Sequence, residues 1–199
     1  MSMYPVLYRL GIRPWERYAE ASRQHVAARF DAEIAERPDP PGRALDLGCG
    51  RGMHTPALAA RGWETVGVDL VPRAIDEARR RDRASTYAVG DVTALPDSLG
   101  TFDHFVDIGC FQALGAPQRR AAGRSITAHA RAGATLLMLA FGRAWFSFEG
   151  VSRAEVEEAF DAWELLRVEP APTEGLGWPL SRTRPSWYRL RLRTRPSAA

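Results

Sequence analysis

ALDLGCGRG, residues 44–52, is the stretch of the sequence that decides the fold. A short apolar run ends at Asp46 and Leu47, and glycine then alternates with other residues at Gly48, Gly50 and Gly52 before a helical pattern begins. Glycine is required where the backbone takes a positive φ or where a ligand approaches it closely. The N-terminus of the following helix offers unpaired N–H groups to an anion. The pattern predicts a strand, a ligand-binding turn and a helix, in that order.

Short apolar runs alternate with longer helix-like stretches on both sides of this turn, which is typical of βαβ units stacked into a parallel sheet. We expect strands at residues 44–47, 65–69, 85–89, 102–108, 133–141, 163–168 and 187–193. We expect helices at residues 14–37, 54–61 and 117–131, and two more that begin at Pro72 and at a capping box of Ser152 and Glu155. These elements fit a single α/β domain over the 199 residues, with helices on both faces of a seven-stranded sheet.

Composition limits the class of protein. Hydrophobic residues make up 45% and charged residues 26% of the chain, which is an ordinary balance for a globular protein. No apolar run approaches the length of about 18 residues that a membrane span needs, and the first residues lack the apolar core of a signal peptide. The two cysteines and four scattered histidines have neither disulfide-framework nor metal-ligand spacing. We therefore expect a soluble, cytoplasmic protein with no membrane partner and no metal.

The charge is uneven along the chain. The net charge is +3, and all 27 basic residues are arginine. After Glu174 there is no acidic residue, although six arginines follow. Around Leu190 and Leu192 these arginines alternate with leucine, which predicts the solvent face of a half-buried strand rather than a surface for nucleic acid. We do not expect nucleic acid as a partner.

Acidic residues at the ends of successive predicted strands indicate which class of ligand the site could bind. Asp69 ends the second strand, where a carboxylate would accept hydrogen bonds from ribose hydroxyls, and Asp91 follows the third strand. The carboxyl ends of parallel strands face one crevice in an open α/β sheet. The dinucleotide fingerprint G-x-G-x-x-G would need glycine at position 53, where the chain has Met53. The turn therefore departs from the pattern for nicotinamide cofactors.

The motifs ALDLGCGRG, ETVGVDL, YAVGDV, FDHFVDIGCFQAL and RAGATLLMLAF follow one another between residues 44 and 141, and in this order they resemble the class I S-adenosylmethionine-dependent methyltransferases. The resemblance implies a Rossmann-like, seven-stranded, mostly parallel sheet with a reversed final hairpin, in a three-layer α/β/α sandwich. It implies S-adenosyl-L-methionine as cofactor and S-adenosyl-L-homocysteine as product. It also divides the single domain, residues 1–199, into a helical lid over cofactor and substrate (1–41), a cofactor-binding core (42–141) and a substrate-side helix with strands (142–199).

The same resemblance implies a role for each residue near the cofactor. Asp46 and the glycine backbone would hold the methionine part, and Asp69 would accept from the ribose hydroxyls. Asp91 would bind the adenine amino group, with Leu70 and Val92 packed on the adenine. The expected cofactor-binding residues are Trp15, Asp46, Gly48, Cys49, Gly50, Gly52, His54, Asp69, Leu70, Asp91, Val92, Asp107 and Ile108.

The fourth motif, DIGCFQAL, is similar to the D-x-G-x-F-H-x-L pattern of compact small-molecule methyltransferases, including those similar to thiopurine methyltransferase. The segment PWERY at 14–18 resembles their cofactor-covering segment. One departure is Gln112, which stands where those relatives carry histidine; an amide can orient a substrate but cannot take its proton. The expected substrate-side residues are Tyr18, Phe111, Gln112, Phe141 and Trp145.

No general base is evident in the sequence. His104 lies in the middle of a predicted strand, as a structural histidine would, and His54 begins a helix, where it is a candidate contact for the cofactor carboxylate. We therefore expect positioning, with Gln112 as the candidate orienting residue, rather than proton removal by a side chain.

The leading hypothesis is methyl transfer to O, N or S of a small molecule. One alternative is an RNA or protein methyltransferase of the same fold, although the N/D-P-P-Y/F tetrad of many such enzymes is replaced here by Asp107-Ile108-Gly109-Cys110. Others are a nicotinamide-dependent oxidoreductase, disfavoured by Met53, and a non-catalytic cofactor-binding protein. The sequence identifies neither the acceptor nor the oligomeric state, monomer or homodimer.

Overall fold

The structure is a computed structural model that describes residues 22–37, 39–142, 150–174, 176, 178 and 180–194. Trp15, Tyr18 and Trp145, expected at the cofactor and the acceptor, lie outside the described residues, as does the first part of the helix expected at 14–37.

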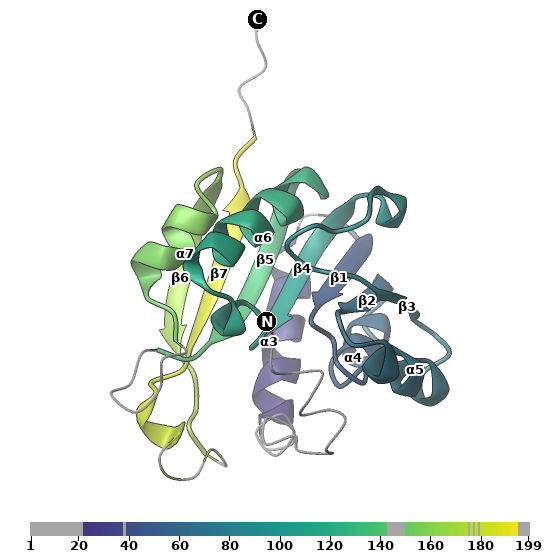
Figure 1. The fold of residues 1–199 in the computed structure, drawn as a ribbon, viewed down its shortest axis with the longest axis horizontal. Helices are drawn as coiled ribbons and strands as arrows, with labels where there is room; N and C mark the ends of the chain where they lie inside the picture. Colours follow the sequence, from purple (N-terminus) through teal and green to yellow (C-terminus); the bar gives the residue numbers. More distant parts are fainter. Residues whose placement is uncertain are drawn as a thin grey trace, which may run out of the picture.

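A seven-stranded sheet runs through the centre of the molecule in the order β3-β2-β1-β4-β5-β7-β6 (Figure 1). Neighbours from β3 to β5 pair in parallel, and β7 runs antiparallel to both β5 and β6. This confirms the mostly parallel sheet with a reversed final hairpin. The strands are β1 (Arg43–Leu47), β2 (Glu64–Asp69), β3 (Thr86–Val89), β4 (Phe102–Ile108), β5 (Ala130–Ala140), β6 (Trp163–Pro170) and β7 (Ser186–Leu192).

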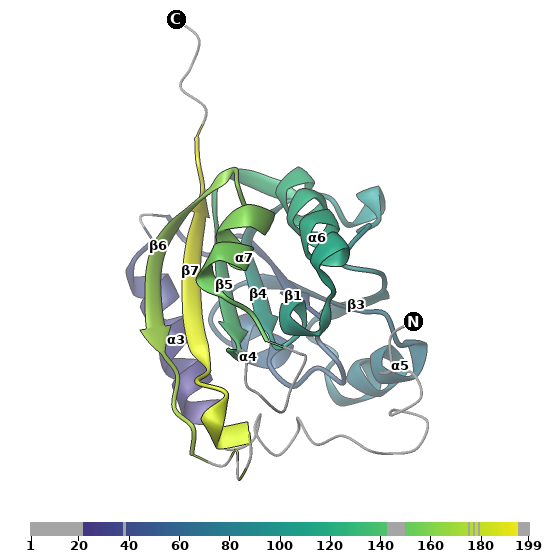
Figure 2. The same ribbon diagram turned by 60° about the vertical axis from the view of Figure 1, so that its left-hand side comes forward.

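Helices cover both faces of the sheet, with α6 and α7 on one face and α3 on the other (Figures 1 and 2). Side chains that alternate along each strand divide the core accordingly. Leu45 and Phe105 pack in the cluster that contains Ile126 of α6 and Val156 of α7, whereas Ala44 packs in the cluster that contains residues of α3 and α4. The described helices are α3 (Arg23–Ala35), α4 (Thr55–Ala59), α5 (Pro72–Arg81), α6 (Ala116–Ala128) and α7 (Arg153–Ala159).

Local signals account for several helix ends. Pro72 occupies the first turn of α5, and Ser152 and Glu155 form the expected capping box of α7. Gly62 ends the α4 segment at φ +89, and its N–H donates to the carbonyl of Ala59.

The largest difference from the predicted boundaries lies at the junction of α6 and β5, and the other described boundaries differ by at most two residues. The helix expected at 117–131 ends at Ala128, and β5 begins at Ala130 rather than at 133. The strand starts early because Ala130 pairs with Phe102 of β4 and the N–H of Phe102 donates to the carbonyl of His129. Tertiary pairing therefore takes these residues out of the helix.

Candidate functional site

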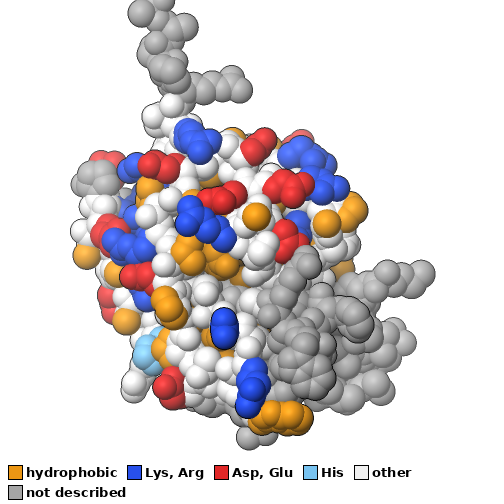
Figure 3. Space-filling view, turned by 90° about the vertical axis from the view of Figure 1, so that its left-hand side faces the viewer, with side chains coloured by type: hydrophobic (Ala, Val, Ile, Leu, Met, Phe, Trp, Pro, Cys, Tyr) orange, Lys and Arg blue, Asp and Glu red, His pale blue; other side chains and the backbone are white. Residues whose placement is uncertain are grey.

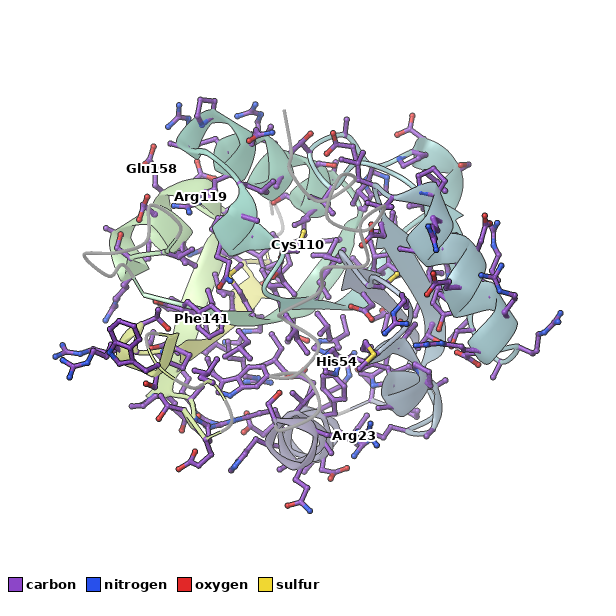
Figure 4. The ribbon with its side chains drawn as sticks, turned by 60° about the horizontal axis from the view of Figure 1, so that its bottom comes forward. Arg23, His54, Cys110, Arg119, Phe141 and Glu158 are labelled. Atoms are coloured by element: carbon purple, nitrogen blue, oxygen red, sulfur yellow. The ribbon has the colours of Figure 1, made fainter. Side chains whose placement is uncertain are left out.

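The carboxyl ends of β1, β2 and β4 meet where the sheet order reverses, between β1 and β4. Ligands of open α/β sheets bind outside the carboxyl ends of the strands at such a switch point. Figure 4 brings this end of the sheet forward, and the side chains that it labels there include His54 before α4, Cys110 after β4 and Phe141 after β5.

The glycine turn after β1 requires its glycines. Gly48, Gly50 and Gly52 have φ values of +66, +56 and +72, which place all three in the left-handed region. A Cβ on Gly48 would lie 2.6 Å from the Cβ of Cys110, and a Cβ on Gly52 would lie 2.6 Å from the hydroxyl of Tyr87. The turn is therefore pressed against the loop after β4 on one side and against β3 on the other.

Asp69 ties the end of β2 to this turn. Its carboxylate accepts from the N–H of Gly50 at 2.9 Å and from the N–H of Val71 at 2.8 Å. Burial raises the pKa of Asp69, although both backbone donors favour the charged form. A carboxylate has about four acceptor positions, so the half-buried side chain has capacity left for hydroxyl donors.

Asp46 points into the protein. Its side chain is buried and accepts from the hydroxyl of Thr55 at 2.6 Å, which fixes the start of α4 against β1. Burial raises its pKa to about 7. Asp46 therefore supports the turn and the helix behind it.

Asp107 has a similar supporting position at the end of β4. It is buried and accepts from the N–H of Cys110 at 2.9 Å and of Phe111 at 3.0 Å, so it shapes the turn in which Gly109 has φ +87. Burial raises its pKa to about 7. Ile108, beside it, is only half-buried.

The residues expected around the adenine lie at the surface of the same edge. Leu70 is 47% exposed and so offers apolar surface at this edge. Asp91 is exposed and accepts from the N–H and the hydroxyl of Thr93, at 2.9 and 2.7 Å. Val92 is buried next to it. An apolar side chain and a carboxylate are thus available after β2 and β3.

Cys49 packs in the core, whereas His54 lies near a cation at the edge of the sheet. The thiol of Cys49 belongs to a core cluster with Ile75 and Tyr87, so its side chain faces the interior of the protein. Burial, together with the nearby Arg23 cation, lowers the pKa of His54 to about 4, so the ring is neutral at pH 7. Figure 4 shows Arg23 close to His54 at this end of the sheet.

Two neighbouring residues that were expected on the substrate side, Phe111 and Gln112, have different surroundings in the structure. The ring of Phe111, expected to contact the acceptor, is instead part of the core, 1% exposed and 5.5 Å from the ring of Phe160. Gln112 is anchored to the end of β5, because its side-chain oxygen accepts from the N–H of Phe141 at 2.6 Å.

His104 is a structural histidine, as expected. Its ring is fully buried, stacked on Trp63, and its Nδ1 lies 2.9 Å from the hydroxyl of Thr135. That hydroxyl donates to Glu33, so it accepts from Nδ1–H of the neutral ring. Burial lowers the pKa of His104 to about 4.

Two supporting residues were missed by sequence reasoning. Thr55 is the partner of Asp46, and Tyr87 fills the space beneath Gly52 and Gly67 while its hydroxyl donates to Asp82 at 2.9 Å. The sequence signal that could have identified Tyr87 was Gly67, because this glycine of β2 pairs with Tyr87 of β3 and leaves room for its ring. Among the described residues, no group of three His, Cys, Asp or Glu side chains is placed to hold a metal ion.

Comparison with known proteins agrees with this geometry. Residues 44–133 match the family model described as a methyltransferase domain. The chain is 30% identical over 141 residues to the 2-heptyl-1-hydroxyquinolin-4(1H)-one methyltransferase of Mycobacteroides abscessus, an alignment that covers 65% of this chain and 62% of that protein. It is 36% identical over 77 residues to the 18S rRNA (guanine-N(7))-methyltransferase of Bos taurus, covering 38% of this chain and 27% of that protein. The chain thus spans less than two thirds of the length of either relative.

Solved structures show the same fold. The N-methyltransferase NodS of Bradyrhizobium japonicum, solved with S-adenosyl-L-homocysteine, superposes with a TM-score of 0.71 at 19% identity, covering 87% of each chain. The family match identifies residues 44–133 as similar to a methyltransferase domain, and the order of the strands and the glycine turn at the switch point agree with that match.

Proposed function

We propose that this chain binds S-adenosyl-L-methionine at the carboxyl ends of β1 to β4 and transfers its methyl group to a small molecule. The observation that supports this most is the glycine turn. Its three residues with positive φ stand at the switch point, and its Gly50 N–H is held by the carboxylate of Asp69. Glycine has no Cβ, so a ligand can approach the backbone closely at these positions.

The residues at this edge fit the parts of the cofactor. Asp69 keeps acceptor capacity for the ribose hydroxyls, and the exposed Leu70 offers apolar surface to the adenine, with Asp91 available for its amino group. The backbone of residues 48–52 would hold the methionine part. Asp46 and Asp107 act on this site indirectly, through the positions of α4 and of the turn after β4. The bound cofactor supplies an already activated methyl group, so the protein's task is to orient the acceptor.

The surface supports a small acceptor over RNA. Arginines of the C-terminal strands are paired with carboxylates: Arg189 with Glu33 at 2.8 Å and Arg191 with Glu164 at 3.0 Å. Figure 3 shows basic and acidic side chains intermixed on the face that contains the β6 side of the sheet. A nucleic-acid surface would instead present unpaired arginines in a single-sign patch. The ribosomal RNA methyltransferase relative keeps RNA as the second candidate.

A labelling experiment tests the proposal. The protein is incubated with S-adenosylmethionine that carries a radioactive methyl group and with three separate pools: hydroxylated heteroaromatic compounds including 2-heptyl-1-hydroxyquinolin-4(1H)-one, total ribosomal RNA, and peptides. We expect label in the small-molecule pool and none with a Gly50→Val variant. Label that appears only in RNA or peptide would refute the small-molecule acceptor.

The location of the protein is a separate point. Within the described ranges, no helix is long and apolar enough to cross a membrane. We propose a cytoplasmic location, as expected from the sequence. Fractionation of cells that express a tagged chain would test this.

A further inference from the structure

Gln112 has a side chain whose orientation the structure determines. It lies in a short 3-10 turn, Phe111–Ala113, directly after β4, and it is 9% exposed. One end of its amide is 2.6 Å from the N–H of Phe141. Since a backbone N–H only donates, the amide atom that it contacts must be the oxygen Oε1. The NH₂ group, Nε2, is therefore the end of the amide that does not contact Phe141.

This NH₂ group lies beside the candidate cofactor site. A Cβ on Gly109 would be 3.8 Å from Nε2, and Gly109 belongs to the turn at the end of β4. The same loop contacts the glycine turn, because Cys110 fills the space next to Gly48. Within the described part of the chain, the hydrogen bonds of Gln112 engage its backbone oxygen, through Arg119, and Oε1, and none engages Nε2.

An amide NH₂ can only donate, and it exchanges no proton with a substrate near neutral pH. We propose that Nε2 of Gln112 donates to the acceptor atom of the substrate, and that this atom is an oxyanion. The substrate class is then an acidic hydroxyl compound, such as a phenol or a hydroxylated heteroaromatic ring, that has ionised in solution before it binds. This inference rests on the proposed function and specifies its substrate.

The transfer then balances without a base. A lone pair of the oxyanion forms the new O–C bond, the C–S bond of the sulfonium breaks, and its electron pair remains on sulfur. The negative charge of the acceptor and the positive charge of the sulfonium disappear together, and no proton leaves in this step. The hydrogen bond from Nε2 orients one lone pair toward the methyl carbon while another accepts from the amide.

The charged and titratable groups near Gln112 are engaged elsewhere, so they are not placed to act as a base for the acceptor. Asp107 accepts from the N–H groups of Cys110 and Phe111 and is buried. Burial raises the pKa of the Cys110 thiol, so it is protonated at neutral pH. Arg119 and Glu155 form an ion pair at 2.7 Å on α6 and α7, behind the turn.

Gln112→Glu is the sharpest test, because glutamate keeps an oxygen for the N–H of Phe141 and replaces the NH₂ donor by a second oxygen. The probes are 4-nitrophenolate, 4-cyanophenolate and phenol, each titrated into protein saturated with S-adenosylhomocysteine. We expect Gln112→Glu to weaken the binding of 4-nitrophenolate by about tenfold to a hundredfold, since a charge-assisted hydrogen bond is lost. Gln112→Met, of similar size but with neither donor nor acceptor amide, should give a loss of the same kind.

S-adenosylhomocysteine affinity, measured by calorimetry, separates this inference from the proposed function. Both variants should bind it within about twofold of wild type, which also shows that the site is folded. If the wild type does not bind it, the proposed function fails. If it binds and wild-type protein takes up none of the phenolates, or Gln112→Glu and Gln112→Met bind 4-nitrophenolate as wild type does, the inference about Gln112 fails alone.

The pH profile tests whether the acceptor ionises in solution before it binds or loses its proton to a group of the protein. In wild-type protein, kcat/KM for each phenol that is methylated should rise with pH around the ionisation of that phenol and shift from one phenol to the next. A profile with the same inflection for every phenol would identify an enzyme group as base and overturn the inference.

Discussion

Replacing Asp69 should affect stability and cofactor binding by separable amounts. Asp69→Ala removes the acceptor for the N–H groups of Gly50 and Val71. Hydrogen bonds to charged groups contribute about 1.5–3 kcal/mol each, and the lower end applies because the side chain is half-buried, so we expect a loss of about 3 kcal/mol. That is a large part of a total stability of about 5–15 kcal/mol, yet it leaves the chain folded.

The effect on the ligand follows from the remaining acceptor positions of the same carboxylate. Loss of its hydrogen bonds to the ribose hydroxyls should weaken S-adenosylhomocysteine binding by about tenfold to a hundredfold. Urea unfolding measures the first effect and calorimetry on the folded protein the second. Asp97→Ala, which removes an exposed carboxylate in a different turn, is the matched control and should change neither. Wild-type ligand affinity in folded Asp69→Ala would refute the role of Asp69 at the ribose.

Three other substitutions test the turn and the core. Gly48→Ala would place a Cβ 2.6 Å from the Cβ of Cys110 on a residue with positive φ. It should therefore lower the free energy of unfolding in urea by about 2–4 kcal/mol. Adding Cys110→Gly should restore part of the loss, and no recovery would mean that the contact is not the cause. Gly50→Val should abolish S-adenosylhomocysteine binding in calorimetry, because φ is +56 and a branched side chain would occupy ligand space; binding at wild-type affinity would make the turn merely structural. His104 stays neutral down to a pKa of about 4, whereas in the unfolded chain it takes up a proton near 6.5, so its contribution to stability is present above pH 6.5 and is lost as pH falls. Relative to His104→Gln, wild type should lose up to about 3 kcal/mol of stability from pH 7 to pH 4, and a difference independent of pH would contradict the burial of a neutral ring.

The fold was predictable because its signals are local. ALDLGCGRG predicted a strand, a glycine turn and a helix in that order, and the structure has this order, with positive φ at Gly48, Gly50 and Gly52. Alternation of arginine and leucine predicted β7, and Ser152 with Glu155 predicted α7. Each of these depends on neighbours within a few residues.

The direction of individual side chains was not predictable in the same way. Asp46 and Asp107 stand at strand ends like Asp69, yet both are buried on supporting hydrogen bonds. Their partners depend on how α4 and the turn after β4 pack, which no spacing in the sequence specifies. The direction of the Phe111 side chain was not predictable either. It was expected to contact the acceptor, but in the structure its ring packs against Phe160 in the core.

Calorimetric titration of wild-type protein with S-adenosylhomocysteine and, separately, with NAD tests the central claim most directly. The account predicts binding of S-adenosylhomocysteine at one site per chain, and no measurable heat with NAD, because Met53 stands where the dinucleotide turn needs its third glycine. Binding of NAD, or the absence of S-adenosylhomocysteine binding by the folded protein, would contradict the assignment of the glycine turn as a methyltransferase cofactor site.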